Sequence, residues 1–126
     1  MILLDTNVLI FLHTYPDRLP GKWINEIKDP KNVLVVSAAS IWEIAIKQSI
    51  KRNNIAVSAK HILNNSRDFG IQILDITPDL VLGVTDLPHL HKDPFDRVII
   101  AQAKQLGCKV MTTDKVFKSY GVNLVD

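Results

Sequence analysis

The chain has 126 residues, which suits one domain (residues 1–126) with a single sizeable core and about two-thirds of its surface buried on folding. With 47% hydrophobic and 22% charged residues, the composition is ordinarily globular and excludes a disordered or low-complexity chain. A net charge of +2 is too mild to indicate nucleic-acid binding by itself.

The first part of the chain alternates short apolar runs with helical patterns. Residues 1–4 predict a strand, and residues 6–13 and 21–28 predict two helices. The continuous apolar run VLVV at 33–36 is typical of a strand that is buried on both faces. A long helix is predicted over residues 38–51.

The same alternation continues to the middle of the chain. A helix is predicted over 58–69, and Gly70 stands where a helix C-terminal glycine belongs. Residues 71–76 predict a third strand, residues 78–85 a helix and residues 87–92 a loop.

The last third of the chain completes the pattern. It predicts a helix over 93–106 that ends at Gly107, a strand at 109–112, a short helix at 115–120 and an edge strand at 122–125. Strands that alternate with helices need crossover connections, so the expected fold is a three-layer α/β/α sandwich with a mainly parallel, roughly five-stranded sheet. Sites in such sheets lie at the carboxyl ends of the strands.

Four acidic residues are expected at that edge of the sheet. Asp5 directly follows the first predicted strand, and Asp114 follows the fourth. Glu43 and Asp96 lie near the start of helices that begin at the same edge. Residues far apart in the sequence should therefore converge on one rim.

Each acid also has a simpler explanation. Asp5, Asp93 and Asp114 could each cap the helix that follows, since aspartate is a favoured N-cap residue. Glu43 stands four residues before Lys47, the favoured orientation for an ion pair on a helix surface. Capping or surface pairing could account for any one of these residues taken alone.

Asp96 fits capping less well than its neighbours do. Apolar residues follow it at helical spacing, at Ile99 and Ile100, which places Asp96 on the inward face of the helix. Like charges gathered at one edge repel and raise one another's pKa unless a cation lies between them. Oxygen ligands without histidine or cysteine suit Mg²⁺ or Mn²⁺, so the acids predict a metal site.

The remaining polar and aromatic features carry weaker predictions. His89 and His91 are interpreted as loop residues near a site or as surface residues rather than zinc ligands, because no partner cysteine or helical histidine pair completes a zinc site. Lys47, Lys51 and Arg52 form a helix end that is either solvated or able to contact a phosphate backbone.

The cysteine content and the lengths of the apolar runs predict the cellular location of the protein. Cys108 is the single cysteine, so an internal disulfide is excluded and a cytoplasmic location is expected. We expect neither a signal peptide nor a membrane span, because Asp5 interrupts the first apolar run and no run approaches about 18 residues.

Four motifs together resemble a known family. LLDTN at the start, S-x-x-S-x-W-E-I in the middle, H-x-DPFDRVIIAQA later and TTD near the end are similar to the motifs of PIN-domain ribonucleases, in the branch of VapC toxins from type II toxin–antitoxin pairs. The match spans essentially the whole chain in the expected order, and the DPFDR–IAQA run makes it specific.

The resemblance implies roles for individual residues. The family's four catalytic acids fall on Asp5, Glu43, Asp96 and Asp114, with Asp5 and Asp96 as the principal metal ligands and the other two acting through water or a second ion. Thr6, Asn7 and Thr112 match polar positions that orient carboxylates or water. Asp93, His91 and Arg97 belong to the DPFDR signature, in which Asp93 is expected to cap the helix and Arg97 to pair with a carboxylate.

The resemblance also implies an activity and partners. The expected protein is a Mg²⁺- or Mn²⁺-dependent endoribonuclease that hydrolyses RNA and leaves a 5′-phosphate, with Lys47, Lys92 and Arg97 near the RNA. A small antitoxin is expected to lie across the site, and a homodimer is expected. Trp23 and Trp42 are candidate contacts for either partner.

Other classes of protein remain possible from the sequence. A receiver-type signalling domain has a similar length and an acidic pocket, but it requires paired acids after the first strand and a lysine after a late strand. A haloacid-dehalogenase-like phosphatase requires Asp-x-Asp, whereas Asn7 stands at the second position. A catalytically silent RNA- or protein-binding module on the same fold is the third alternative.

Overall fold

The computed structural model describes residues 1–50 and 57–126, and its centre is a four-stranded parallel sheet. The strands are β1 (Ile2–Leu4), β2 (Leu34–Ser37), β3 (Gln72–Leu74) and β4 (Lys109–Met111), in the order β3-β2-β1-β4. Because all the pairings are parallel, the carboxyl ends of the four strands lie at one edge.

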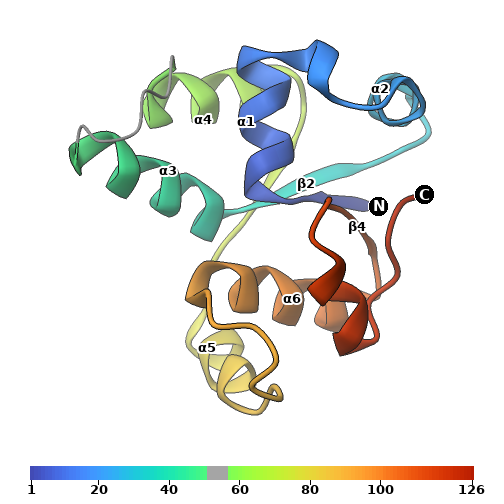
Figure 1. The fold of residues 1–126 in the computed structure, drawn as a ribbon. Coiled ribbons are helices and arrows are strands. Elements are labelled where there is room, and N and C mark those ends of the chain that lie inside the picture. Colours follow the sequence, from blue (N-terminus) through green and yellow to red (C-terminus); the bar gives the residue numbers. More distant parts are fainter. Residues whose placement is uncertain (51–56) are drawn as a thin grey trace.

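Helices cover both faces of the sheet (Figure 1). One layer contains α1 (Thr6–Thr14), α2 (Gly21–Lys28), α3 (Ala38–Ile50) and α4 (Ala59–Asp68), and the other contains α5 (Pro78–Thr85), α6 (Pro94–Leu106) and the 3₁₀ helix η2 (Lys115–Tyr120). Successive strand residues alternate between the two cores: Leu3 packs with Ile99 and Phe117, whereas Leu4 packs with Val8 and Ile44. The three-layer α/β/α prediction is therefore confirmed.

The strand count is the main correction to the predicted fold. The expected fifth strand at 122–125 is reduced to a single parallel bridge between Leu124 and Val110. Val110 donates its N–H to the Asn123 carbonyl and accepts from the Val125 N–H, at 2.8 and 2.9 Å. Of the three residues of β4, the bridge involves the central one, Val110.

Other predicted boundaries differ slightly from the structure. The third strand is shorter than the predicted 71–76, residues 115–120 form a 3₁₀ helix, and an unpredicted 3₁₀ turn, η1, spans Pro16–Arg18. The predicted end of the long helix at Lys51 lies outside the described residues. Gly70 and Gly107 follow α4 and α6 with φ of 80° and 63°, as their predicted C-terminal positions require.

The strand order also tests one alternative left open by the sequence, the receiver-type signalling domain. Receiver domains have the flavodoxin-like order 2-1-3-4-5. The observed order places β1 between β2 and β4, with β3 at the edge, so the receiver alternative is wrong. Among the described helices, none combines the length and apolar character required to cross a membrane.

Candidate active site

Asp5 lies at the carboxyl end of β1 and is almost fully buried, with 5% of its surface exposed. Its Oδ1 accepts the Thr6 N–H at 2.7 Å, so the residue does cap α1, and its Oδ2 accepts the Thr112 hydroxyl at 2.7 Å. Burial raises the pKa of Asp5, and the nearby carboxylates of Glu43 and Asp114 raise it further, although the two hydrogen bonds oppose the change.

Glu43 reaches the same edge of the sheet from α3, and 8% of its surface is exposed. Its Oε2 lies 3.0 Å from the Lys47 ammonium, so the ion pair considered from the sequence is present. Its Oε1 is buried and has no hydrogen-bond partner among the described residues. A buried carboxylate oxygen without a partner is costly, and a cation at the site would satisfy it.

Asp96 lies in the first turn of α6, one turn after the Asp93 cap. Asp93 Oδ1 accepts the N–H groups of Phe95 and Asp96 at 2.8 and 3.3 Å, which confirms the predicted capping role. Burial, followed by the negative charges of Asp5 and Asp93, raises the pKa of Asp96 to about 7. A cation near this carboxylate would favour its ionised form.

Asp114 completes the group from the segment after β4. Its Oδ1 accepts the Val116 N–H at 3.0 Å and caps η2, while its Oδ2 lies 2.8 Å from His91 Nε2. The Thr112 hydroxyl accepts the Asp114 N–H at 3.0 Å and donates to Asp5. Thr112 therefore links two of the four acids, in agreement with its predicted orienting position.

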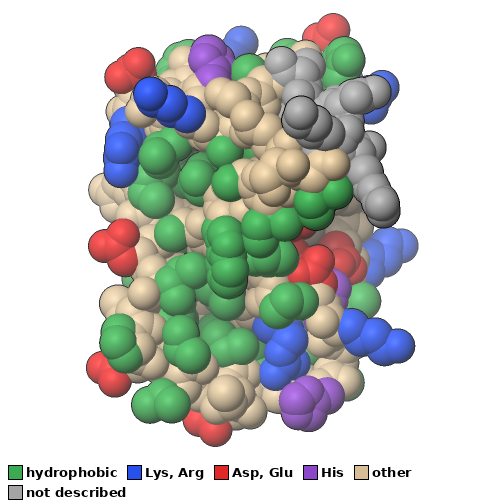
Figure 2. All heavy atoms as spheres, turned by 90° about the vertical axis from the view of Figure 1, so that its left-hand side faces the viewer, with side chains coloured by type: hydrophobic (Ala, Val, Ile, Leu, Met, Phe, Trp, Pro, Cys, Tyr) green, Lys and Arg blue, Asp and Glu red, His purple; other side chains and the backbone are tan. Residues whose placement is uncertain are grey.

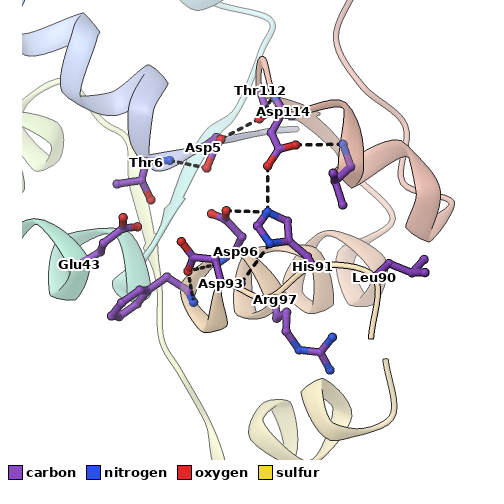
Figure 3. A network of polar contacts seen from close by, with 12 residues as sticks. Asp5, Thr6, Glu43, Leu90, His91, Asp93, Asp96, Arg97, Thr112 and Asp114 are labelled. Atoms are coloured by element: carbon purple, nitrogen blue, oxygen red, sulfur yellow. Dashed lines mark hydrogen bonds and ion pairs between the residues drawn. The ribbon is translucent and has the colours of Figure 1, made fainter. Parts of the chain in front are cut away.

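His91 is the site residue whose position the sequence did not predict. Its Nε2 lies 2.8 Å from Asp114 Oδ2 and 3.0 Å from Asp96 Oδ2, and the three atoms are within 4.8 Å of one another (Figure 3). The structure therefore adds a histidine to the predicted group of acids, whereas the prediction that the metal ligands are oxygens alone stays a prediction. The HKDPFD run contained the signal, since it places His91 just before the cap of α6.

The other predicted supporting residues divide into two groups. Thr6 is buried, and its hydroxyl contacts that of Ser40 at 2.8 Å, which ties α1 to α3. Asn7 is exposed on α1, and its side chain makes no hydrogen bond within the described part of the chain. Lys47 and Lys92 line a hollow of about 460 Å³ next to Glu43. Lys51 and Arg52 lie outside the described residues.

Arg97 corrects another prediction, because it pairs with no carboxylate of the described residues. Its guanidinium is buried and donates to the carbonyls of Val84, Leu87 and Pro88, at 2.8 to 3.2 Å. The side chain points away from the acids toward the segment that follows α5 (Figure 3). Arg97 therefore anchors the chain that leads to His91.

The two tryptophans also differ from each other. Trp23 is buried in the core, and its indole N–H donates to the Asp126 carbonyl at 2.8 Å, so the prediction that it contacts a partner is wrong. Trp42 is 57% exposed and packs edge-on against Phe95, with 5.0 Å between the ring centroids.

The four acids and His91 lie together at the carboxyl edge of the sheet (Figure 3). Glu43 and Asp114 raise the pKa of Asp5, and Asp5 and Glu43 raise the pKa of Asp96, so the four acids are coupled electrostatically. Their carboxylate oxygens, and the unpaired Glu43 Oε1 in particular, fit a hard divalent cation.

Comparison with known proteins agrees with this architecture. The family model of the PIN domain matches residues 2–123. No curated protein gives a significant match.

Solved structures share the fold at low sequence identity. VapBC2 from Rickettsia felis, bound to a promoter DNA fragment, is 17% identical with a TM-score of 0.75, covering 99% of this chain and 98% of that one. VapC20 from Mycobacterium tuberculosis, a toxin that cleaves the sarcin–ricin loop, is 15% identical with a TM-score of 0.74 and coverages of 99% and 98%. DNA-bound VapBC from Salmonella typhimurium is 17% identical with a TM-score of 0.72 and coverages of 99% and 96%.

Proposed function

This chain belongs to the PIN domain family, and we propose that it is a metal-dependent endoribonuclease, the toxin of a type II toxin–antitoxin pair, with residues 1–126 as its single nuclease domain. One observation carries the proposal: four carboxylates from separate elements converge where the strands end, and a buried oxygen of Glu43 lacks a partner within residues 1–50 and 57–126. Such a group is destabilising unless it binds a cation.

The acids have distinct parts in the proposed site. Asp5 and Asp96 would hold Mg²⁺ or Mn²⁺, and Glu43 and Asp114 would act through water or a second ion. When bound, the ion supplies neutralisation of phosphate charge and a water of lowered pKa. Thr112 keeps Asp5 oriented, since its hydroxyl is bonded to the Oδ2 of that residue.

Hydrolysis requires a group that accepts a proton from the attacking water. Glu43 suits this step, because its Oε1 has no partner among the residues that the structure describes, while Lys47 holds its Oε2 in place. Attack of water on phosphorus with departure of the 3′-oxygen leaves a 5′-phosphate and a 3′-hydroxyl. The RNA 2′-hydroxyl takes no part as a nucleophile in this reaction.

The proposed RNA path runs from the acids into the adjacent hollow. Lys47 and Lys92 are on its lining, where their ammonium groups can contact backbone phosphates beside the cleaved one. Phe95 and Pro94 also line the hollow and provide an apolar surface for an unstacked base. Single-stranded loops of folded cytoplasmic RNA fit such a site better than a continuous duplex.

An antitoxin partner is proposed from two observations. Several structures with this fold are toxin–antitoxin complexes, among them VapBC2 and the VapBC of Salmonella typhimurium. Figure 2 shows hydrophobic side chains spread over the face on the left of Figure 1, with a group of acidic side chains beside them. An antitoxin segment, a second copy of the chain, or both could cover such a surface.

Cleavage of RNA by the purified chain tests the proposal. A mixture of structured RNAs is incubated with Mg²⁺, with Mn²⁺ or with EDTA, in parallel with the variants Asp96→Asn and Asp79→Asn. Asp79 is an exposed aspartate on α5 and serves as the matched control. We expect metal-dependent cutting that Asp96→Asn abolishes and Asp79→Asn preserves. Equal cutting by both variants, or cutting unaffected by EDTA, would contradict it.

A further inference from the structure

His91 lies between two of the four acids, and its role depends on which of its two ring nitrogens donates a hydrogen bond and which accepts one. Nε2 is 2.8 Å from Asp114 Oδ2 and 3.0 Å from Asp96 Oδ2 (Figure 3). A ring nitrogen in this place could either bind a metal through its lone pair or donate a proton to the carboxylates. The two roles require opposite tautomers of the imidazole.

The other ring nitrogen decides between the two tautomers. The backbone N–H of Asp93 donates to His91 Nδ1 at 3.1 Å. A nitrogen that accepts a hydrogen bond has no proton of its own, so the proton of the neutral ring is on Nε2. Binding a metal through Nε2 would move that proton to Nδ1, where it would face the Asp93 N–H directly.

The backbone around His91 is held in place from the opposite side. The Tyr120 hydroxyl accepts the N–H groups of Leu90 and His91, at 3.0 and 2.8 Å, and donates to the Pro88 carbonyl at 2.8 Å. Arg97 donates to the same Pro88 carbonyl at 2.8 Å. These bonds fix a segment that has no regular secondary structure, and with it the position of the imidazole.

We propose that His91 is a positioning residue that donates its Nε2 proton to Asp114, beside Asp96, and that it is not a metal ligand. This inference rests on the proposed metal-dependent site. Asp114 uses Oδ1 to cap η2, so the bond from His91 fixes the orientation of its second oxygen. The carboxylates are therefore already oriented when an ion binds. Hydrogen-bond partners of metal ligands commonly have this orienting role.

The tautomer can be observed directly by NMR. Long-range ¹H–¹⁵N spectra of uniformly ¹⁵N-labelled protein are recorded without metal and after addition of Mg²⁺, and His91 is assigned by its loss in His91→Gln. We expect a protonated Nε2 and an unprotonated Nδ1 in both states. A proton on Nδ1, or loss of the Nε2 proton when Mg²⁺ is added, would overturn the proposal.

Mg²⁺ affinity, measured by calorimetry, provides the second readout. We expect about tenfold weaker binding for His91→Ala, partial recovery in His91→Gln, whose amide N–H can still donate, and no change for His89→Ala. His89 is an exposed histidine of the same loop and is the matched control. Unchanged binding by His91→Ala, or no recovery by His91→Gln, would refute the positioning role. If the wild-type protein bound no Mg²⁺, the proposed function would fail, and the tautomer would still decide the role of His91.

Discussion

Replacing Arg97 by methionine should destabilise the protein severely, although the residue makes no contact with a carboxylate. Arg97 is 8% exposed and donates four hydrogen bonds, of which those to Pro88 and Val84 are the shortest, at 2.8 and 3.0 Å. Those to Leu87 and to the Tyr120 hydroxyl are longer, at 3.2 and 3.3 Å. Methionine fills a similar volume but can donate none of them.

The expected loss of stability follows from what each acceptor retains. Pro88 keeps the Tyr120 hydroxyl as a donor, and the Val84 carbonyl keeps the Leu87 N–H. The Leu87 carbonyl loses its partner among the described residues. Two charge-assisted bonds at about 1.5 kcal/mol each, with about 1 kcal/mol for the unpaired carbonyl, give a loss of about 4 kcal/mol.

Urea unfolding followed by far-UV circular dichroism measures this loss. Arg67→Met is the matched control, because Arg67 is exposed on α4, and we expect its effect to stay below about 0.5 kcal/mol. If the Arg97 variant were no less stable than the Arg67 variant, Arg97 would not anchor the segment before His91.

Three further predictions follow from the site and its supporting helices. Without metal, the free energy of unfolding should fall as pH rises from about 4 to 8. Asp96, with a pKa of about 7, keeps its proton in the folded protein at pH values where the unfolded chain has already released it. The raised pKa of Asp5 acts in the same direction. Urea unfolding at several pH values measures this slope, which Asp96→Asn should flatten; an unchanged slope would contradict the assignment. Glu43→Gln should slow RNA cleavage about a hundredfold or more at unchanged circular dichroism, if it accepts the proton of water, and a wild-type rate would exclude that role. Gly107→Ala should lower the free energy of unfolding, measured with urea, by about 1 kcal/mol, because the φ of Gly107 is +63°. Gly83→Ala is the control: Gly83 lies inside α5 with open space around it, so alanine there should leave stability unchanged or raise it. Equal effects of the two variants would contradict the strain argument.

The positions of the acids could be predicted from the sequence because topology determines them. Once the strands are parallel, residues that follow a strand closely must lie at the shared edge, as Asp5 and Asp114 do. Asp96 was identifiable because the apolar residues after it show which face of α6 is buried. These inferences required chain order and helical period, and no knowledge of tertiary contacts.

The position of His91 could not be predicted in that way. It lies in a segment without helical or strand period, whose path depends on Arg97 and on Tyr120, the latter 29 residues further along the chain. Trp23 illustrates the same limit for burial. A helical pattern places its side chain on one face of α2, but its burial depends on residues far along the chain, such as Met111 in the same core, and its indole N–H donates to Asp126.

Capping and metal binding, which the sequence presents as competing explanations, are compatible in this structure. Asp5 caps α1 and Asp114 caps η2, each with Oδ1, and each directs Oδ2 toward another site residue. Backbone N–H groups at a helix start favour negative charge, so these helices offset part of the repulsion among the acids. Glu43 caps no helix, and its Oε1 has no partner in the described part of the chain. The need for a bound water or a second ion should therefore be greatest at Glu43, where helix termini contribute least.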